Sequence, residues 1–251
     1  MEITSVNNDL VKETVKLQQK KYRAKSGKFL LEGYKPVFEA ANSGIKLEHI
    51  FVLKDRADKY DFIKQELILT NEPVLKKIST TDTAPDVVAV GVQPAENKEV
   101  GSKVILLENI SDAGNFGTIV RSAVAFGIDT IVLYGDTVDV YNPKCVRSAV
   151  GNLWKVNIIH IKEFEELNRL FKDYERVATL PKTDNSVWLK DWRNNVKQDD
   201  KVLVMFGSEA DGLSQELKDF ATQNLIIEMS PKVESLNLST TASIIMYEMM
   251  G

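Results

Sequence analysis

Residues 103–134 read KVILLENISDAGNFGTIVRSAVAFGIDTIVLY, and this stretch decides the fold class. Its two apolar runs, 104–107 and 130–134, have the length and composition of buried strands. Between them apolar side chains recur at helical spacing, with Asn115 a suitable cap at the helix start and Gly127 a suitable end. A strand, a helix and a second apolar strand predict a β-α-β unit whose strands run parallel.

The same alternation continues toward the C-terminus. Further strands are expected at 156–161, 177–180, 202–206 and 225–227. Apolar residues at helical spacing fill the segments between these strands. We therefore predict an α/β domain with a parallel sheet that helices cover on both faces.

The N-terminal part has a different, mixed pattern. Helices are expected at 8–24 and 34–43, and strands at 29–31, 49–53 and 86–92. The polar stretch QPAENKEVGS, which starts at residue 93, lacks periodicity and is typical of a linker. These patterns predict a small α/β domain over residues 1–96, which includes the start of the linker, and a larger domain over residues 97–251.

Composition limits the class of protein. Of the 251 residues 43% are hydrophobic and 27% are charged, which is typical of a globular protein with room for two domains. The single cysteine, Cys145, excludes an internal disulfide, and the two histidines, His49 and His160, are too far apart in the sequence to indicate a metal site. No apolar run is long enough to span a membrane, and the start MEITSVNNDL lacks the pattern of a signal peptide. We therefore expect a cytoplasmic protein without membrane contact.

Positive charge is concentrated near the N-terminus. Residues 1–96 carry 15 basic and 14 acidic side chains, whereas the whole chain has a net charge of −4. Residues 12–28 hold seven basic side chains and one acidic one, which indicates either a phosphate-binding surface or a solvated helix face. An aromatic ring within this segment is suited to stacking on a base. The candidate RNA-binding residues are Lys12, Lys16, Lys20, Lys21, Tyr22 and Arg23.

Three predicted strands are each followed by a polar segment, and we call these segments the polar junctions. In parallel sheets, ligands bind where strands end and helices begin. The first polar junction includes Asn115 and Arg121, and Arg121 falls outside the apolar stripe of its helix. Taken alone, this junction is explained by a helix cap and a surface arginine. Its glycines do not form the dinucleotide-binding fingerprint.

The second polar junction, FGSEADGL from residue 206 onward, places Gly207 and Glu209 directly after an apolar strand. The third lies before the last predicted helix and contains Ser235 and Asn237. Taken alone, the second junction is explained by a tight turn and the third by ordinary capping of a helix N-terminus.

Taken together, the polar junctions resemble the three signature segments of the SpoU (TrmH-type) RNA 2′-O-methyltransferases of the SPOUT superfamily. The matching segments are N-F-G-x-x-x-R at 115–121, G-S-E-x-x-G-L at 207–213 and E-S-L-N-L-S at 234–239. Their order and spacing fit over residues 103–251. Residues 1–92 are more loosely similar to the RNA-binding domain often found ahead of this catalytic domain. One such segment is weak evidence, whereas three in order are specific.

This resemblance implies a C-terminal trefoil knot, which is an exception to the rule that chains do not knot, and a homodimer. It also implies S-adenosyl-L-methionine as methyl donor, no metal, and RNA as methyl acceptor. The positions that match cofactor-binding residues of the family are Gly207, Ile227, Met229 and Leu236. Glu228 stands where the family usually has proline, so the resemblance does not fix the shape of the loop around it.

The resemblance also implies roles for the catalytic candidates. Arg121 matches the residue that activates the ribose hydroxyl in the family. Because a guanidinium stays protonated, we expect Arg121 to clamp a phosphate and to stabilise the developing alkoxide. Ser235 and Asn237 are expected to orient this arginine and the ribose. Asn115 and Glu209 are expected to hold the loops around them.

Alternatives remain open from the sequence. Large-subunit (23S) ribosomal RNA is the first expected substrate, because the basic leading domain resembles that of ribosomal RNA enzymes, and transfer RNA is the second. A non-catalytic RNA-binding or ribosome-assembly protein on the same fold would bind no S-adenosylmethionine, or would bind it without turnover. A nucleotide-binding oxidoreductase is disfavoured, because the chain lacks the glycine fingerprint.

Overall fold

The computed structural model describes residues 1–181, 186–197 and 200–250, and these form two compact units. The first unit contains Met1–Ala95 together with Asp139–Trp154. The second contains Glu96–Val138 and the chain from Lys155 onward. The first unit is therefore built from two separate stretches of the sequence.

A five-stranded mixed sheet forms the centre of the first unit. Its strands are β1 (Glu2–Ile3), β2 (Lys28–Glu32), β3 (Leu47–Leu53), β4 (Leu67–Thr70) and β5 (Val87–Val92), in the spatial order β1-β4-β3-β5-β2. The β1–β4 and β3–β4 pairs are parallel, and β5 pairs antiparallel with both β2 and β3. The mixed α/β pattern expected for this part is present. The very short β1 and β4 were not predicted, because such short strands carry too little periodicity to detect.

Helices surround this sheet. They are α1 (Asp9–Lys16), α2 (Lys20–Ser26), α3 (Tyr34–Asn42), α4 (Glu72–Ile78) and α6 (Pro143–Ser148), with a 3-10 helix η1 (Lys54–Tyr60). The single helix predicted over 8–24 is wrong, since the chain forms α1 and α2 with a break between them. The break has a tertiary cause: the Gln18 side-chain amide donates to the carbonyls of residues 77–79 at 2.8–3.2 Å, at the end of α4. The sequence pattern of residues 8–24 cannot reveal this contact, because its partners lie about sixty residues further along the chain.

The second unit has a seven-stranded sheet in which every pair of neighbours is parallel. The strands are β6 (Lys103–Glu108), β7 (Thr130–Tyr134), β8 (Asn157–Ile161), β9 (Glu175–Thr179), β10 (Ser186–Trp188), β11 (Val202–Phe206) and β12 (Gln223–Ile226). Their spatial order is β10-β12-β9-β11-β6-β7-β8. The predicted parallel sheet is confirmed. The short β10 was not predicted, and β12 begins two residues before the predicted strand.

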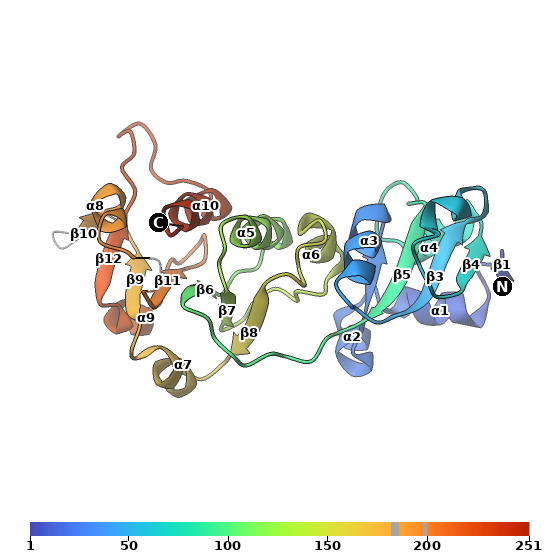
Figure 1. Cartoon of the computed structure of the whole chain (residues 1–251), viewed down its shortest axis with the longest axis horizontal. Helices are drawn as coiled ribbons and strands as arrows, with labels where there is room; N and C mark the ends of the chain where they lie inside the picture. The colour runs from blue at the N-terminus through green and yellow to red at the C-terminus, as the bar shows by residue number, and fades with distance from the viewer. Residues whose placement is uncertain (182–185, 198–199, 251) are drawn as a thin grey trace. The chain divides into compact units, whose positions relative to one another are not determined.

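Helices cover both faces of this sheet. They are α5 (Ala113–Ala125), α7 (Phe164–Phe171), α8 (Leu189–Arg193), α9 (Gln215–Phe220) and α10 (Leu238–Glu248). Figure 1 shows α5, α8 and α10 on one side of the sheet and α7 and α9 on the other. Alternate strand residues such as Val104 and Leu106 join Leu167 of α7 and Leu217 of α9 in one buried cluster. The intervening residues are also buried, which is why the strands are apolar throughout.

The N-terminus of α5 differs from the sequence prediction. Asp112, and not Asn115, caps this helix, because the Asp112 carboxylate accepts from the backbone N–H of Asn115 at 2.7 Å. The Asn115 side chain is therefore available for contacts outside its own helix. No helix among the described residues is long and apolar enough to cross a membrane. The trefoil knot stays a prediction.

Candidate active site

The strand order places the polar junctions at one edge of the parallel sheet. From β6 the chain runs outward through β7 and β8, and it then crosses to the other side of β6, where β11 is the neighbour. In open parallel sheets, the crevice at such a reversal of strand order is where ligands bind, beyond the carboxyl ends of the strands. The first polar junction follows β6 and the second follows β11, so both border this crevice.

A chain of side-chain hydrogen bonds joins the three polar junctions. The Asn115 amide nitrogen donates to a Glu209 carboxylate oxygen. The Asn237 amide nitrogen in turn donates to the Asn115 carbonyl oxygen at 3.1 Å. One residue from each junction is therefore held to another by a direct polar contact, which fixes the relative positions of three loops that are distant in sequence.

Asn237 also forms the N-terminal cap of α10. Its side-chain oxygen accepts from the backbone N–H of Ser239 at 2.9 Å and from the Ser239 hydroxyl at 2.6 Å. Further along the same helix, the Ser243 hydroxyl lies 2.7 Å from that of Ser122 on α5. Asn237 is therefore a helix cap, as the sequence suggested, but it has a second role. Its side-chain oxygen caps α10, and its side-chain nitrogen donates to Asn115.

The second polar junction folds back on itself. The backbone N–H of Gly212 donates to the Ser208 carbonyl at 3.0 Å, and Gly212 has a φ of 67°, in the left-handed region that glycine adopts readily. A Cβ placed on Gly207 would collide with the Gly212 backbone. Both glycines are thus required by the turn, which presents Glu209 to Asn115.

Arg121 and Ser235 are not joined to this chain of hydrogen bonds. Both side chains are exposed, and Arg121 lies in the middle of α5. Among the described residues, no hydrogen bond or ion pair occupies the Arg121 guanidinium or the Ser235 hydroxyl. The structure therefore brings three of the five catalytic candidates together and leaves the other two accessible from solvent.

The cofactor-binding candidates lie on loops at the same edge of the sheet. Gly207 follows β11, and the other three belong to residues 227–237, which follow β12 and which we call the cofactor loop. Ile227 and Leu236 are half-buried, whereas Met229 is 42% exposed. The cofactor loop therefore offers apolar side chains beside a polar site.

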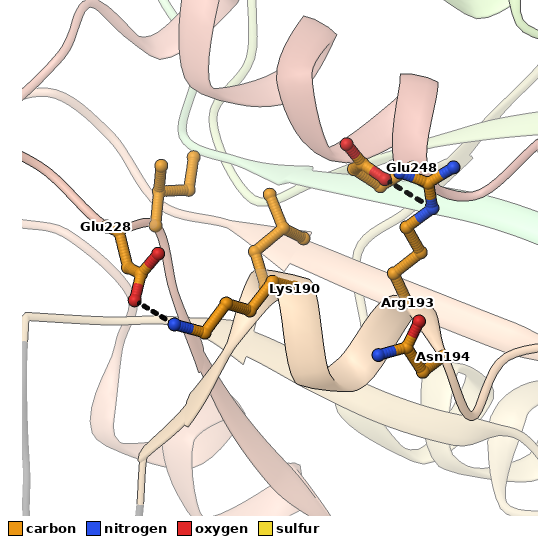
Figure 2. Close-up of a pocket in the computed structure, with 7 residues that line it drawn as sticks. Lys190, Arg193, Asn194, Glu228 and Glu248 are labelled. Atoms are coloured by element: carbon orange, nitrogen blue, oxygen red, sulfur yellow. Dashed lines mark hydrogen bonds and ion pairs between the residues drawn. The ribbon is translucent and has the colours of Figure 1, made fainter.

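Helix α8 contacts the start of the cofactor loop. Lys190 Nζ lies 2.6 Å from the Glu228 carboxylate, and Arg193 Nε lies 3.0 Å from the carboxylate of Glu248 on α10. Figure 2 shows both pairs at a groove of about 370 Å³ that Ile227 also lines. The Glu228 carboxylate raises the pKa of Lys190 above its usual value, so this lysine stays charged. Glu228, which stands where the family usually has proline, is therefore paired with Lys190.

Sequence reasoning missed the part played by α8. The segment LKDWR is too short to show helical periodicity, and its two cations resemble any solvated surface. The unusual acid at position 228 was the available signal, because it stands where the family usually has proline and its carboxylate can attract a cationic side chain.

The candidate RNA-binding residues lie on α1 and α2 of the first unit. Lys12 pairs with Asp9 at 3.2 Å and Lys16 with Glu13 at 2.5 Å, while Lys20 and Lys21 are exposed. Tyr22 is half-buried, and the Lys21 ammonium lies 4.8 Å from the centre of its ring.

Arg23 is a correction to the predicted surface. It is only 2% exposed, and its guanidinium donates to the Asp139 carboxylate at 2.6 and 2.9 Å and to the Leu17 carbonyl at 2.8 Å. A guanidinium so enclosed is not accessible to an RNA phosphate. Arg23 therefore fixes α2 in the first unit, and we remove it from the candidate surface.

Comparison with known families decides between the alternatives left by the sequence. Residues 102–247 match the SpoU rRNA Methylase family, and residues 8–89 match the MRM3-like substrate binding domain. The chain belongs to the SpoU rRNA methylase family. It is thus a methyltransferase, and the oxidoreductase and the non-catalytic alternatives lose their support. Within the described residues, no group of histidine, cysteine and acidic side chains is arranged to hold a metal ion.

Relatives of this SpoU methylase match it over nearly its full length. The 23S rRNA guanosine 2′-O-methyltransferase RlmP of Bacillus subtilis is 28% identical over 100% of the chain and 99% of its own length. An uncharacterized tRNA/rRNA methyltransferase of Synechocystis is 30% identical over 98% of the chain and 92% of its own length. The crystal structure of an AdoMet-bound rRNA methyltransferase from Sinorhizobium meliloti has a TM-score of 0.84 at 28% identity, and the match covers 99% of this chain and 97% of that one.

Proposed function

We propose that this protein transfers a methyl group from S-adenosylmethionine to a ribose 2′-hydroxyl of large-subunit ribosomal RNA. The observation that carries the proposal is the contact of Asn115 with Glu209 and with Asn237 at the reversal of strand order. This contact joins all three segments by which the family is recognised. The name of the Bacillus subtilis relative, which matches the whole chain, supports ribosomal RNA as the substrate. We also propose a cytoplasmic location, by analogy with the bacterial rRNA methyltransferase that matches the whole chain.

The cofactor loop and the second polar junction fit the proposed methyl donor. Gly207 has no side chain, and the Gly212 backbone fills the space that a Cβ would take, so a tight turn can form at the end of β11 beside the proposed donor site. Ile227, Met229 and Leu236 supply apolar contacts of the kind that a purine ring needs. When bound there, S-adenosylmethionine supplies an electrophilic methyl group.

Arg121 is the residue we assign to the ribose. A ribose hydroxyl is a weak nucleophile, so transfer needs its proton removed or its developing negative charge stabilised. The exposed Arg121 guanidinium, which no acid among the described residues neutralises, is suited to hold a phosphate and to stabilise the alkoxide. Ser235 and Asn237 are proposed to orient the ribose, with Asn115 and Glu209 holding the loops in place.

We further propose that the active protein is a homodimer in which each active site contains residues of both subunits. Arg121 is six residues from Asn115, which places it about 120° away around α5. The face of α5 that carries Asn115 and Ser122 is bonded to α10 and to its cap Asn237, so Arg121 lies off the face that meets Asn237 of its own chain. A second copy would supply the missing partner. Tyr247 and Met250, which are 56% and 48% exposed at the end of α10, offer apolar surface for such a contact.

The experiment that tests the proposed function compares three strains: one without the gene, one restored with the natural gene, and one restored with Arg121→Ala. Ribose 2′-O-methyl groups are mapped across ribosomal and transfer RNA in each. We expect one mark in large-subunit RNA to disappear on deletion, to return with the natural gene, and to stay absent with Arg121→Ala. Guanosine 2553, named for the Bacillus subtilis relative, is the first position to inspect.

Binding of the methyl donor is the control for that variant. Calorimetric titration with S-adenosylmethionine should give unchanged affinity for Arg121→Ala, because Arg121 acts on the acceptor and not on the donor. A strain without the gene that keeps every ribose mark contradicts the proposal. Loss of a mark in transfer RNA instead would reassign the substrate.

A further inference from the structure

A groove of about 380 Å³ lies in the first unit between α1, α2 and residues of the strands β2, β3 and β5. Sites that hold small organic ligands have volumes of roughly 300–1,000 Å³, so the groove has room for one nucleotide. Its lining combines an aromatic ring with several cations. The residues that matter here are Glu13, Lys16, Tyr22, Lys25, Lys28 and His49.

The charge of the groove favours an anion. Its single lining acid, Glu13, is paired with Lys16 at 2.5 Å, and Lys28 is paired with Glu48 at 2.6 Å. Lys25 is exposed and has no ion-pair partner among the described residues. One ammonium group is thus available for a phosphate without breaking an existing pair.

Tyr22 is held in place within this groove. The residue after it, Arg23, fixes α2 through its contacts with Asp139 and with the Leu17 carbonyl. The helix then ends at Gly27, which has a φ of 65° and turns the chain into β2. A ring on a fixed helix loses little conformational entropy when a base stacks on it, which favours its use as a stacking platform.

We propose that this groove binds one unpaired nucleotide of the RNA, with the base against the Tyr22 ring and the phosphate at Lys25. The inference rests on the proposed function and adds to it a preference for single-stranded RNA. A base in a duplex is already stacked on its neighbours and cannot reach a ring inside a groove. Of the six RNA-binding candidates from the sequence, Tyr22 and Lys16 line the groove. Arg23 does not line it, but its contact with Asp139 holds the helix that carries Tyr22.

The test measures binding of a fluorescent single-stranded oligouridine, and of a duplex of the same length, to the full-length protein. Tyr22→Ala should weaken binding of the single strand by about tenfold, whereas Tyr22→Phe, which keeps the ring, should bind as the natural protein does. Lys25→Glu should reduce the slope of log affinity against log salt by about 0.7, the value for one phosphate contact in a single strand. Lys64→Glu makes the same charge change at an exposed site outside the groove and should leave that slope unchanged.

The proposal is overturned if Tyr22→Ala binds as tightly as the natural protein, if Tyr22→Phe loses as much affinity as Tyr22→Ala, or if duplex is bound in preference to single strand. Tighter binding of oligoglutamate than of oligouridine would assign the groove to an acidic peptide instead. Folding of Tyr22→Ala is checked by circular dichroism, and the exposed Lys25→Glu tests the groove independently of that variant.

Failure of this inference can be distinguished from failure of the proposed function. If Tyr22→Ala and Lys25→Glu methylate the RNA with natural dependence on RNA concentration, the groove is not a nucleotide site although the enzyme assignment stands. If the natural protein binds oligouridine through Tyr22 but no ribose mark depends on the gene, the groove stands and the methyl-transfer proposal fails.

Discussion

Asn115 performs a task at the residue scale that few side chains could perform. Its amide donates to Glu209 through nitrogen and accepts from Asn237 through oxygen. A carboxylate can only accept, and a hydroxyl is too short to reach both partners from one helix position. The contact therefore requires an amide, and it joins two loops through one residue.

This requirement gives a prediction for Asn115→Asp, which keeps the size of the side chain and removes the donor. The new carboxylate would face Glu209, and we expect the catalytic efficiency, kcat/KM, to fall roughly fivefold to tenfold. Steady-state kinetics with saturating RNA and varied S-adenosylmethionine measures kcat/KM for the methyl donor. Asn168→Asp, the same exchange on α7 at the opposite face of the sheet, serves as control. Natural efficiency in Asn115→Asp would show that the contact is dispensable.

Individual residues were predictable from the sequence to different degrees. The three polar junctions identify Asn115, Glu209 and Asn237 without any coordinates, because their order and residue types are specific. The cap of α5 was misassigned, because Asp112 and Asn115 are both good capping residues and only the backbone conformation distinguishes them. The burial of Arg23 depends on Asp139, which is distant in the sequence and was not part of any local pattern.

At the scale of elements, α8 and the cofactor loop form a unit linked by charge. Glu228 lacks the rigidity of the proline that the family usually has at this place, and its ion pair with Lys190 is a different way to restrain the loop. Because both side chains are more than half exposed, water and salt screen the pair, so it adds little to the stability of the fold. Its effect should therefore be on positioning and not on overall stability.

We predict that Lys190→Glu and Glu228→Lys each raise the KM for S-adenosylmethionine severalfold and leave kcat much less changed. Each single change sets two like charges against one another, which displaces the loop. The double variant, Lys190→Glu with Glu228→Lys, exchanges the two charges and restores an attractive ion pair. It should recover most of the affinity for S-adenosylmethionine. Kinetics at low and at high salt measure the effect. A double variant as poor as the worse single variant would contradict this role.

Elements differed in how well the sequence predicts them. The central strands β6, β7 and β11 were predicted almost to the residue, because a parallel strand that is buried on both faces has a continuous apolar run. The short strands β1, β4 and β10 were not, because the sheet and not the local sequence stabilises them. The break between α1 and α2 is fixed by Gln18 and the end of α4, which no pattern within residues 8–24 reveals.

At the scale of the whole molecule, the proposed shared site has a direct consequence. If Arg121 of one protomer acts with Asn237 of its partner, two different inactive variants can make one complete site between them. Asn237→Ser is suitable for this purpose, because serine still caps α10 but its shorter side chain lacks the amide nitrogen that reaches Asn115.

We therefore predict that Arg121→Ala and Asn237→Ser, each inactive alone, recover activity when they are co-expressed. Random pairing of equal amounts should give about a quarter of the natural activity, because half of the dimers contain one intact site of two. Separate affinity tags isolate the mixed dimer, whose activity should approach half the natural value. No recovery in a purified mixed dimer would show that Arg121 and Asn237 act within one protomer.

The division of the chain into two units was only partly accessible from the sequence. The change from mixed to regular α/β patterning near residue 96 marks the first crossing of the chain between the units. The crossings at 138–139 and 154–155 have no signal of their own, because Asp139–Trp154 follows a buried strand as any loop and helix would. Contacts with distant residues decide where this segment folds.

Asp139–Trp154 contributes essential contacts to the first unit. Tyr141 and Trp154 lie against the buried Phe29 ring, with ring centres 4.9 and 5.7 Å away, and Arg147 pairs with the fully buried carboxylate of Glu32. A transplant of RNA specificity onto another methyltransferase would therefore need two pieces from the donor gene, the leading ninety or so residues and this later insert. A cut at the linker alone would transfer Arg23 without Asp139 and Glu32 without Arg147, so two buried charges would lose their ion-pair partners.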